Sequence, residues 1–342
     1  MDTENFFRIN AEALGMLFVG ITDLERDRRF DQFTQWISQS KHAGMDYLAR
    51  NQSFRSCPTQ LLPGAKRAII LALPYGKPSP IEETNNQPIV ARYAQIPDYH
   101  RLLKQRATQL IEAFFRETGN CFAFRVCVDS SPILEKGLAE KTGRGFIGKN
   151  TLFIDPQFGS FCLLAEILTS TPLPLTRPVS NPSKHAEGCG TCNKCQINCP
   201  TGALKTAYTL DASRCLSYWT GVHSGPIPPE FWPHLARYYY GCDTCQLVCP
   251  HNFSKQPLID LTTLKIPSLF DTATMDPTGF KRYFGNSVMT YLKRNALRRN
   301  ALIAMAVTKH NRLNEAMEIA GKDDSYPIAE TLDAIKSLRR HV

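Results

Sequence analysis

The sequence predicts an α+β protein in three parts: an N-terminal α/β domain over residues 1–172, a cysteine-rich domain over 173–255 and a helical segment over 256–342. Three observations support this division. Helical and strand-like patterns alternate over roughly the first 170 residues. Eight of the twelve cysteines lie between positions 189 and 249. Beyond that region cysteine is absent, and from residue 285 the apolar residues follow a helical spacing.

The N-terminal domain is predicted from its hydrophobic periodicity. Residues 16–22 and 68–73 are short, mostly apolar runs typical of strands. Residues 101–117 carry apolar side chains at helical spacing with Arg and Lys between them, which predicts an amphipathic helix. Apolar residues alternate over 122–128 and predict a further strand. This alternation of element types is the basis for the α/β assignment.

Asp129 follows the strand at 122–128, where a residue is well placed to face a ligand. Ser131 and Pro132 fit the N-cap and first position of a helix that ends near Gly143. Burial in a pocket would raise the pKa of the Asp129 carboxyl group, so that it holds and donates a proton near neutral pH. Capping of the next helix is an equally good interpretation of this aspartate.

A glycine-rich segment at 143–150 nearly matches the phosphate-binding pattern G-x4-G-K-[ST]. Asn150 replaces the hydroxyl residue that binds Mg2+, and the segment lies between a predicted helix and a strand predicted over 151–154, the reverse of a P-loop. We therefore expect no nucleoside triphosphate site. Its glycines still allow a large ligand to approach closely, with Arg144 and Lys149 nearby for polar groups.

Prolines at 172, 174, 178 and 182 predict a linker into the cysteine-rich domain. The average composition, the lack of a long apolar segment and an acidic N-terminus without secretory features predict a cytoplasmic protein with no membrane partner. The formal net charge is +9, and residues 277–314 hold eight Lys or Arg and no acidic residue. This segment is interpreted either as a surface for an anionic partner or as a solvated helix face.

Four cysteines followed by proline form C-x2-C-x2-C-x3-C-P, the bacterial ferredoxin run in which the last cysteine binds the other cluster of a pair. They are Cys189, Cys192, Cys195 and Cys199. A second run consists of Cys242, Cys245 and Cys249, again followed by proline. Cys215 is the remaining cysteine of the region and completes a set of eight. The spacing thus predicts two [4Fe–4S] clusters.

The ferredoxin rule gives a crossed ligand assignment. The first cluster would be held by Cys189, Cys192, Cys195 and Cys249, and the second by Cys199, Cys215, Cys242 and Cys245. Zinc also binds paired C-x2-C motifs and is the alternative. Eight clustered thiolates and two Cys-Pro endings favour the iron–sulfur interpretation. Cytosolic reduction of thiols also disfavours disulfides here.

Several segments together resemble the epoxyqueuosine reductase family. They are 128–136 (VDSSPILEK), 145–151 (GFIGKNT), both cysteine runs, 214–220 (RCLSYWT) and 225–228 (GPIP). The resemblance covers roughly residues 10–300. It implies an enzyme that reduces epoxyqueuosine to queuosine at the wobble position of tRNA. Electrons would pass from an external low-potential donor through two [4Fe–4S] clusters to cobalamin.

The resemblance also implies roles for individual parts of the chain. Asp129 would be the catalytic proton donor, and the C-terminal segment would be a HEAT-like module that binds tRNA. Cobalamin would contact Arg92, Tyr93, Asp129, Lys149, Phe153 and Ser160 in the N-terminal domain. Phosphates of tRNA would contact Lys293, Arg294, Arg298 and Arg299. The protein is expected to act as a monomer.

The chain departs from the family pattern in two places. Its helical segment is shorter than a full repeat module, and His251 follows Cys-Pro where family members often have Trp. It also lacks the D-x-H-x-x-G motif that supplies a lower histidine ligand to cobalt. Two other functions stay open at this point: a corrinoid iron–sulfur reductive dehalogenase, and a ferredoxin-type electron-transfer subunit.

Overall fold

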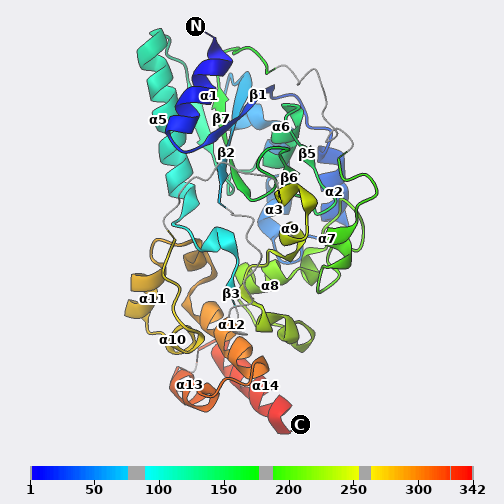
Figure 1. The fold of residues 1–342 in the computed structure, drawn as a ribbon, viewed down its shortest axis with the longest axis vertical. Coiled ribbons are helices and arrows are strands. Elements are labelled where there is room, and N and C mark those ends of the chain that lie inside the picture. Colours follow the sequence, from blue (N-terminus) through cyan, green and yellow to red (C-terminus); the bar gives the residue numbers. More distant parts are fainter. Residues whose placement is uncertain (1, 76–88, 177–187, 254–262, 324, 341–342) are drawn as a thin grey trace.

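The structure is a computed structural model that describes residues 2–75, 89–176, 188–253, 263–323 and 325–340. Within these residues a four-stranded antiparallel sheet forms the centre of the N-terminal domain (Figure 1). Its strands run in the order β1 (Leu17–Asp23), β2 (Arg67–Pro74), β7 (Cys162–Thr169) and β4 (Phe124–Cys127). The strands predicted over 16–22, 68–73 and 122–128 are therefore confirmed, with small changes at their ends.

Helices cover both faces of this sheet. Alternate residues of β2 explain why its apolar run is continuous, because Ile69, Leu71 and Leu73 enter one core while Ala68, Ile70 and Ala72 enter the other. Helices α1 (Thr3–Ala13) and α5 (Tyr99–Thr118) pack against the first face, and α6 (Glu135–Lys141) packs against the second. The predicted amphipathic helix at 101–117 corresponds to α5.

The helix after Asp129 begins later than the sequence predicts. Asp129 has a φ of 47°, in the left-handed region, and the chain turns through residues 129–133 before α6 starts at Glu135. Leu134 is the N-cap residue, so the capping role expected for Ser131 with Pro132 is wrong. Instead the Ser131 hydroxyl group bonds to the Cys127 thiol. The turn leaves Asp129 outside both regular elements.

The glycine-rich segment folds into a short antiparallel hairpin of β5 (Phe146–Ile147) and β6 (Phe153–Ile154). It follows helix α6 and precedes a strand, as expected for a segment that is not a P-loop. Other short helices complete this part of the chain: α2 (Phe30–Ser38), α3 (Asp46–Arg50) and α4 (Gln52–Ser56).

The cysteine-rich region has little regular structure, and backbone hydrogen bonds between two strands join it to the N-terminal domain. It contains α7 (Lys194–Ile197), α8 (Leu216–Gly221), β8 (Tyr238–Tyr240) and α9 (Thr244–Leu247). β8 pairs in parallel with β3 (Ile89–Val90), which precedes α5. The predicted linker is described only as far as residue 176, and the boundary predicted between 255 and 256 lies outside the described residues.

The C-terminal segment is helical, as predicted. Its elements are α10 (Leu269–Thr274), α11 (Pro277–Phe284), the 3-10 helix η7 (Val288–Leu292), α12 (Arg294–Val307), α13 (Leu313–Ala320) and α14 (Ile328–Arg340). α12 lies at its centre and also packs on β8 and the 3-10 helix η5 (Pro229–Ala236) of the cysteine-rich region. No helix of the described residues is both long and apolar enough to span a bilayer.

Candidate active site

A cavity of about 350 Å³ lies where the N-terminal domain meets the cysteine-rich region. The N-terminal domain contributes residues from α5, the turn after β4, the hairpin and β7, whereas the cysteine-rich region contributes three separate loops. The lining includes apolar side chains with polar groups between them, the usual character of a cofactor or substrate site. Its polar members include Tyr75, Tyr93, Tyr99, Asp129, Glu135, Ser160 and Asp243.

The eight cysteines of the two runs separate into two groups of four. Cys199, Cys215, Cys242 and Cys245 line the large cavity. Cys189, Cys192, Cys195 and Cys249 line a second cavity of about 20 Å³. These groups have the same members as the crossed assignment. Among the described residues no three His, Cys, Asp or Glu side chains form a group that could hold a metal ion, but in a cubane each thiolate binds a different iron and the four need not converge on one atom.

The quartet of Cys189, Cys192, Cys195 and Cys249 is called the first quartet, and that of Cys199, Cys215, Cys242 and Cys245 the second. Backbone and lysine groups surround the first quartet. The Lys149 backbone N–H donates to the Cys189 Sγ at 3.3 Å, and its Nζ donates to the Gly190 and Cys192 carbonyl oxygens at 2.7 and 2.9 Å. Burial and the neighbouring thiols raise the pKa of Cys249 to about 11, and burial raises that of Cys215 to about 11. Bound iron would lower these thiol pKa values again, because a coordinating thiol is deprotonated by the metal.

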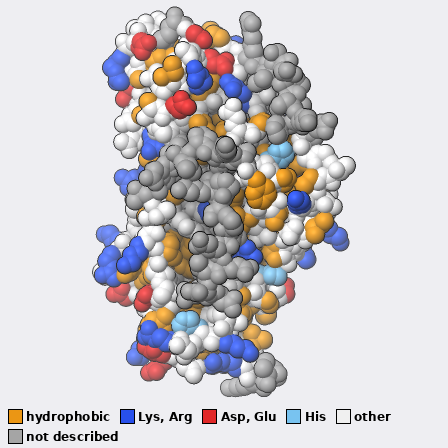
Figure 2. Space-filling model, viewed as in Figure 1, with side chains coloured by type: hydrophobic (Ala, Val, Ile, Leu, Met, Phe, Trp, Pro, Cys, Tyr) orange, Lys and Arg blue, Asp and Glu red, His pale blue; other side chains and the backbone are white. Residues whose placement is uncertain are grey.

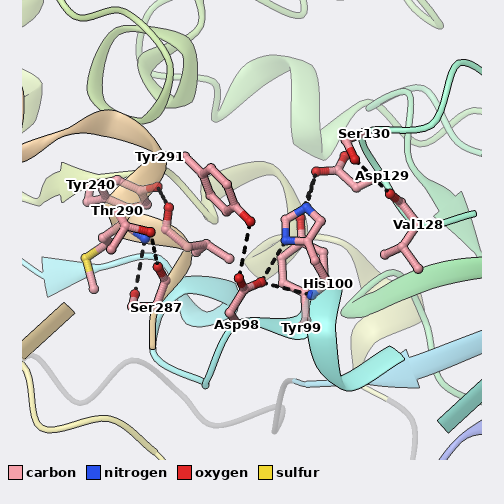
Figure 3. A network of polar contacts seen from close by, with 12 residues as sticks. Asp98, Tyr99, His100, Val128, Asp129, Ser130, Tyr240, Ser287, Thr290 and Tyr291 are labelled. Carbon is pink, nitrogen blue, oxygen red and sulfur yellow. Dashed lines mark hydrogen bonds and ion pairs between the residues drawn. The ribbon is translucent and has the colours of Figure 1, made fainter. Parts of the chain in front are cut away.

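Asp129 belongs to a chain of polar contacts that begins at the N-terminus of α5 (Figure 3). The His100 Nε2 lies 2.9 Å from the Asp129 Oδ2, and the Tyr99 hydroxyl donates to the same oxygen at 3.1 Å. The other ring nitrogen, Nδ1, lies 2.8 Å from the Asp98 Oδ1. The Tyr291 hydroxyl in turn donates to the Asp98 Oδ2 at 3.2 Å.

These contacts change the expected protonation of the site. Partial burial raises the pKa of Asp129, but hydrogen bonds from His100 and Tyr99 outweigh it, and the pKa lies below its ordinary value. The expectation that this carboxyl group holds a proton near neutral pH is therefore wrong. Burial lowers the pKa of His100, but its bonds to Asp129 and Asp98 dominate and raise it. A protonated imidazole can donate from both nitrogens, so two facing carboxylates favour the charged form of His100.

Two further acids lie beside this network and were not found from the sequence. Glu135 lines the cavity, and burial together with the Asp129 charge raises its pKa to about 7. Glu166 on β7 is fully buried, and neither carboxyl oxygen has a partner among the described residues. Burial raises the pKa of Glu166 well above its ordinary value, which favours its protonated, neutral form. Its position inside the apolar run 162–169 was an available signal.

The residues expected to contact cobalamin do not all reach the cavity. Tyr93, Asp129, Phe153 and Ser160 line it. Lys149 instead lines the smaller cavity of the first quartet. The Arg92 side chain packs over the Phe161 ring, with 5.0 Å from its guanidinium carbon to the ring centre, while its backbone N–H donates to the Asp243 Oδ2 at 2.7 Å. Arg92 thus supports the wall of the cavity without being among its lining residues.

The four residues expected to contact tRNA phosphates divide into two pairs. Lys293 is exposed and Arg294 is partly exposed. Arg298 and Arg299 are only 3% and 0% exposed, and their guanidinium groups bond to protein oxygens. The expectation that these two bind phosphates is therefore wrong, because they lie on the inward face of α12. On the face shown in Figure 2, Lys and Arg side chains are visible over the part of the molecule that holds the C-terminal helices.

Two cysteine quartets, one of which lines a cavity together with the Asp129 network, are features of an iron–sulfur oxidoreductase. A family model described as "4Fe-4S double cluster binding domain" matches residues 188–252, and one described as "Epoxyqueuosine reductase QueG, DUF1730" matches residues 55–130. The chain belongs to the epoxyqueuosine reductase family.

Relatives and solved structures agree with this placement. The epoxyqueuosine reductase of Pseudomonas aeruginosa is 40% identical over 248 residues, covering 71% of this chain and 67% of the relative. That of Aliivibrio fischeri is 34% identical over 338 residues, covering 96% and 88%. With the Escherichia coli enzyme the match covers 62% of the relative. The structure from Streptococcus thermophilus has a TM-score of 0.83 at 27% identity, covering 97% of this chain and 89% of that one.

Proposed function

We propose that this protein reduces epoxyqueuosine to queuosine at the wobble position of tRNA. A solved relative, with a TM-score of 0.80 and 27% identity, contains an epoxyqueuosine-modified tRNA-Tyr stem loop. The observation that carries the proposal is that one cavity is lined both by a cysteine quartet and by the Asp129 network. Removal of the epoxide oxygen as water needs two electrons and two protons. The cysteine quartet would carry the electrons, and the Asp129 network would carry protons.

The cysteine quartets would each hold one [4Fe–4S] cluster. The quartet in the large cavity would deliver electrons to the reacting centre, and the quartet of Cys189, Cys192, Cys195 and Cys249 would receive them from an external low-potential donor. Cubanes carry electrons singly, so two transfers complete one reaction. The cytoplasm would provide both the external electron donor and the tRNA.

Cobalamin fits the same cavity by its wall chemistry. Phe153, Leu164 and Tyr75 supply apolar surface, and Ser160 and Tyr93 supply polar groups. The described residues that line the cavity include no histidine, so a bound cobalamin would lack a histidine ligand from this wall. When bound, cobalamin would supply a strongly reducing metal centre beside the substrate. The apolar and polar residues of this wall would hold it and exclude water, and the same cavity is lined by Cys199, Cys215, Cys242 and Cys245.

Asp129 and His100 would provide the proton for the departing oxygen. Asp129 is 55% exposed on its side chain and reaches into the cavity, whereas His100 stands behind it and is only 12% exposed. A proton held on His100 can pass through the shared Oδ2 of Asp129 to the substrate oxygen. A related Bacillus subtilis enzyme was solved with its catalytic aspartate loop swung out of the active site. The strained turn at Asp129 suits a loop that moves.

A reductive dehalogenase is not favoured, since the relatives described above are epoxyqueuosine reductases. The test is anaerobic turnover of an epoxyqueuosine-containing stem loop with a chemical reductant, followed by nucleoside digestion and mass spectrometry. We expect a product lighter by one oxygen atom. An organohalide serves as the second substrate, and its turnover without turnover of the stem loop would refute the proposal. Sedimentation of the same sample tests the proposal that the enzyme is a monomer.

A further inference from the structure

Arg299 and Asn300 form a buried polar unit on α12, on the side that faces the cysteine-rich region. Both residues are 0% exposed. The Arg299 Nε and Nη2 donate to the Asn300 Oδ1 at 3.0 and 2.7 Å, which fixes the two side chains to each other. Burial lowers the pKa of Arg299 to about 9, so it is still a cation at neutral pH. A buried charge is costly unless strong polar partners surround it.

The partners of this unit are backbone carbonyl groups of one region. Arg299 donates to the carbonyl oxygens of Trp219 at 3.1 Å and His223 at 3.0 Å, and also to that of Gly225. Asn300 donates to the carbonyl oxygens of Thr220 and Tyr239, each at 2.8 Å. Most of these carbonyls lie at or just beyond the C-terminus of α8, where a helix leaves carbonyls without partners and a cation is favourable.

These carbonyls lie close in sequence to two members of the second quartet. Cys215 is the N-cap residue of α8, and the backbone N–H groups of Ser217 and Tyr218 point to its sulfur. Tyr239 lies in β8, which leads through Gly241 to Cys242. Because α8 is only six residues long, fixing its C-terminal end also fixes the direction of its N-terminal end. The carbonyl groups that Arg299 and Asn300 bind therefore belong to the two short segments that carry Cys215 and Cys242.

We propose that Arg299 and Asn300 are positioning residues for the second iron–sulfur cluster, through which the C-terminal helical segment sets the placement of Cys215 and Cys242. Hydrogen bonds and backbone placement around cluster sulfurs tune both assembly and reduction potential. The first quartet has no member in α8 or beside β8, so the effect is specific to the second. This inference rests on the cluster assignment proposed above and not on the RNA substrate.

Arg298 provides a matched control for this proposal. It precedes Arg299 on the same helix and is equally buried, at 3% exposure. Its guanidinium group bonds to the Ala273 carbonyl oxygen at 3.0 Å and to Asp323 at 2.5 Å, both within the helical segment. Arg298→Lys therefore perturbs the packing of α12 without changing the contacts to α8 and β8. A general loss of stability would affect Arg298→Lys and Arg299→Lys alike.

The experiment compares Arg299→Lys, Asn300→Ala and Arg298→Lys as anaerobically reconstituted holoprotein. Iron and sulfide are quantified, and both clusters are titrated by electron paramagnetic resonance. We expect about eight irons per chain in wild type and Arg298→Lys, and about four in Arg299→Lys. Asn300→Ala removes the two bonds to the Thr220 and Tyr239 carbonyl oxygens and the two that Arg299 donates to the Asn300 Oδ1, while Arg299 keeps its three backbone carbonyl partners. This variant should shift the potential or the signal of one cluster only.

The outcomes separate the possibilities. Arg299→Lys and Asn300→Ala with full iron and unchanged signals would overturn the inference. Equal losses from both clusters, or equal losses in Arg298→Lys, would also overturn it, because they indicate general instability. If Arg299→Lys is insoluble, Asn300→Ala decides. A wild-type protein without two clusters would instead refute the cluster assignment.

Discussion

The Nε2 of His100 and the Oδ2 of Asp129 lie 2.9 Å apart, while the Nδ1 of His100 lies 2.8 Å from Asp98. One imidazole thus joins an aspartate that lines the cavity to an aspartate that caps α5. The capping aspartate also accepts a hydrogen bond from Tyr291 in the C-terminal segment. The network around Asp129 therefore joins three separate parts of the chain.

Asp129→Asn should abolish most turnover while both clusters remain. The amide keeps the size of the side chain but cannot relay a proton, and a positioned acid contributes about 10²–10⁴-fold to rate. Single-turnover kinetics with the modified stem loop measure the loss. Ser130→Ala is the neighbouring control, because within the described residues its hydroxyl group donates to the Val128 carbonyl oxygen at 3.4 Å and not to the His100–Asp129 pair. Undiminished turnover in Asp129→Asn would remove the residue from the mechanism.

Asp98→Asn should move the pH dependence of turnover. The pKa of His100 is raised by Asp129 and Asp98, so its protonated form persists above the ordinary value near 6.5 and is lost as pH rises through the raised pKa. Turnover should fall over that window. Removing one carboxylate lowers the His100 pKa and shifts the descending limb to lower pH. Asp276→Asn, at the N-cap of α11, is the control and should keep the wild-type limb; identical limbs in both variants would contradict the assignment.

The free energy of unfolding of Glu166→Gln, measured relative to wild type, should increase with pH. The folded-state pKa of Glu166 lies well above its unfolded value. Between those two values the unfolded chain releases a proton that the folded chain retains, so wild type loses about 1.4 kcal/mol of stability per pH unit. Glutamine does not titrate. Thermal unfolding at pH 5 and pH 8 tests this, with the exposed Glu112→Gln on α5 as control. A difference that does not grow with pH would show that Glu166 is ionised in the folded state.

Pairs of cysteine substitutions should reveal the crossed ligand pattern. Cys249→Ser and Cys189→Ser are each expected to remove one cluster, and their combination should still retain about four irons because both belong to the same quartet. Cys199→Ser combined with Cys189→Ser should remove both clusters. An uncrossed pattern predicts the opposite result for the two combinations. Iron and sulfide analysis after anaerobic reconstitution distinguishes them.

Lys293→Ala should weaken binding of the tRNA stem loop more or less equally for modified and unmodified RNA. A lysine that contacts a phosphate contributes counterion release, so its loss should reduce the slope of log affinity against log salt by about one. Lys336→Ala on α14 is the control, since Lys336 is also exposed but bonds to Asp333 at 3.4 Å. Equal salt slopes for wild type and Lys293→Ala would exclude a phosphate contact.

Periodicity and spacing predicted the framework because they reflect local physics. The strand before Asp129 and helix α5 follow from their apolar patterns, and the cysteine spacings gave the same two groups of four that line the two cavities. The start of α6 was missed because the left-handed turn at Asp129 depends on contacts with α5, which local capping preferences do not include.

Charge counting could not separate surface from interior in the C-terminal segment. Lys293 and Arg299 are both cations in one acid-free stretch, yet one is exposed and the other is surrounded by carbonyl oxygens of a region about 75 residues earlier in the chain. The pKa of Asp129 was misjudged for a related reason. Burial alone raises it, and its histidine partner is brought near only by the fold. An Asp-Tyr-His sequence at a helix start was the available signal.

The parallel pairing of β3 with β8 places the segment that leads to Tyr93 beside the segment that leads to Cys242. The Ala91 N–H donates to the Tyr240 carbonyl oxygen at 2.8 Å. Ala91 directly precedes Arg92, and Tyr240 lies two residues before Cys242. Main-chain bonds of this kind persist whatever side chains occupy the strands. The distance between the Tyr93 segment and the Cys242 segment is thus set by the backbone and does not depend on the side chains of either strand.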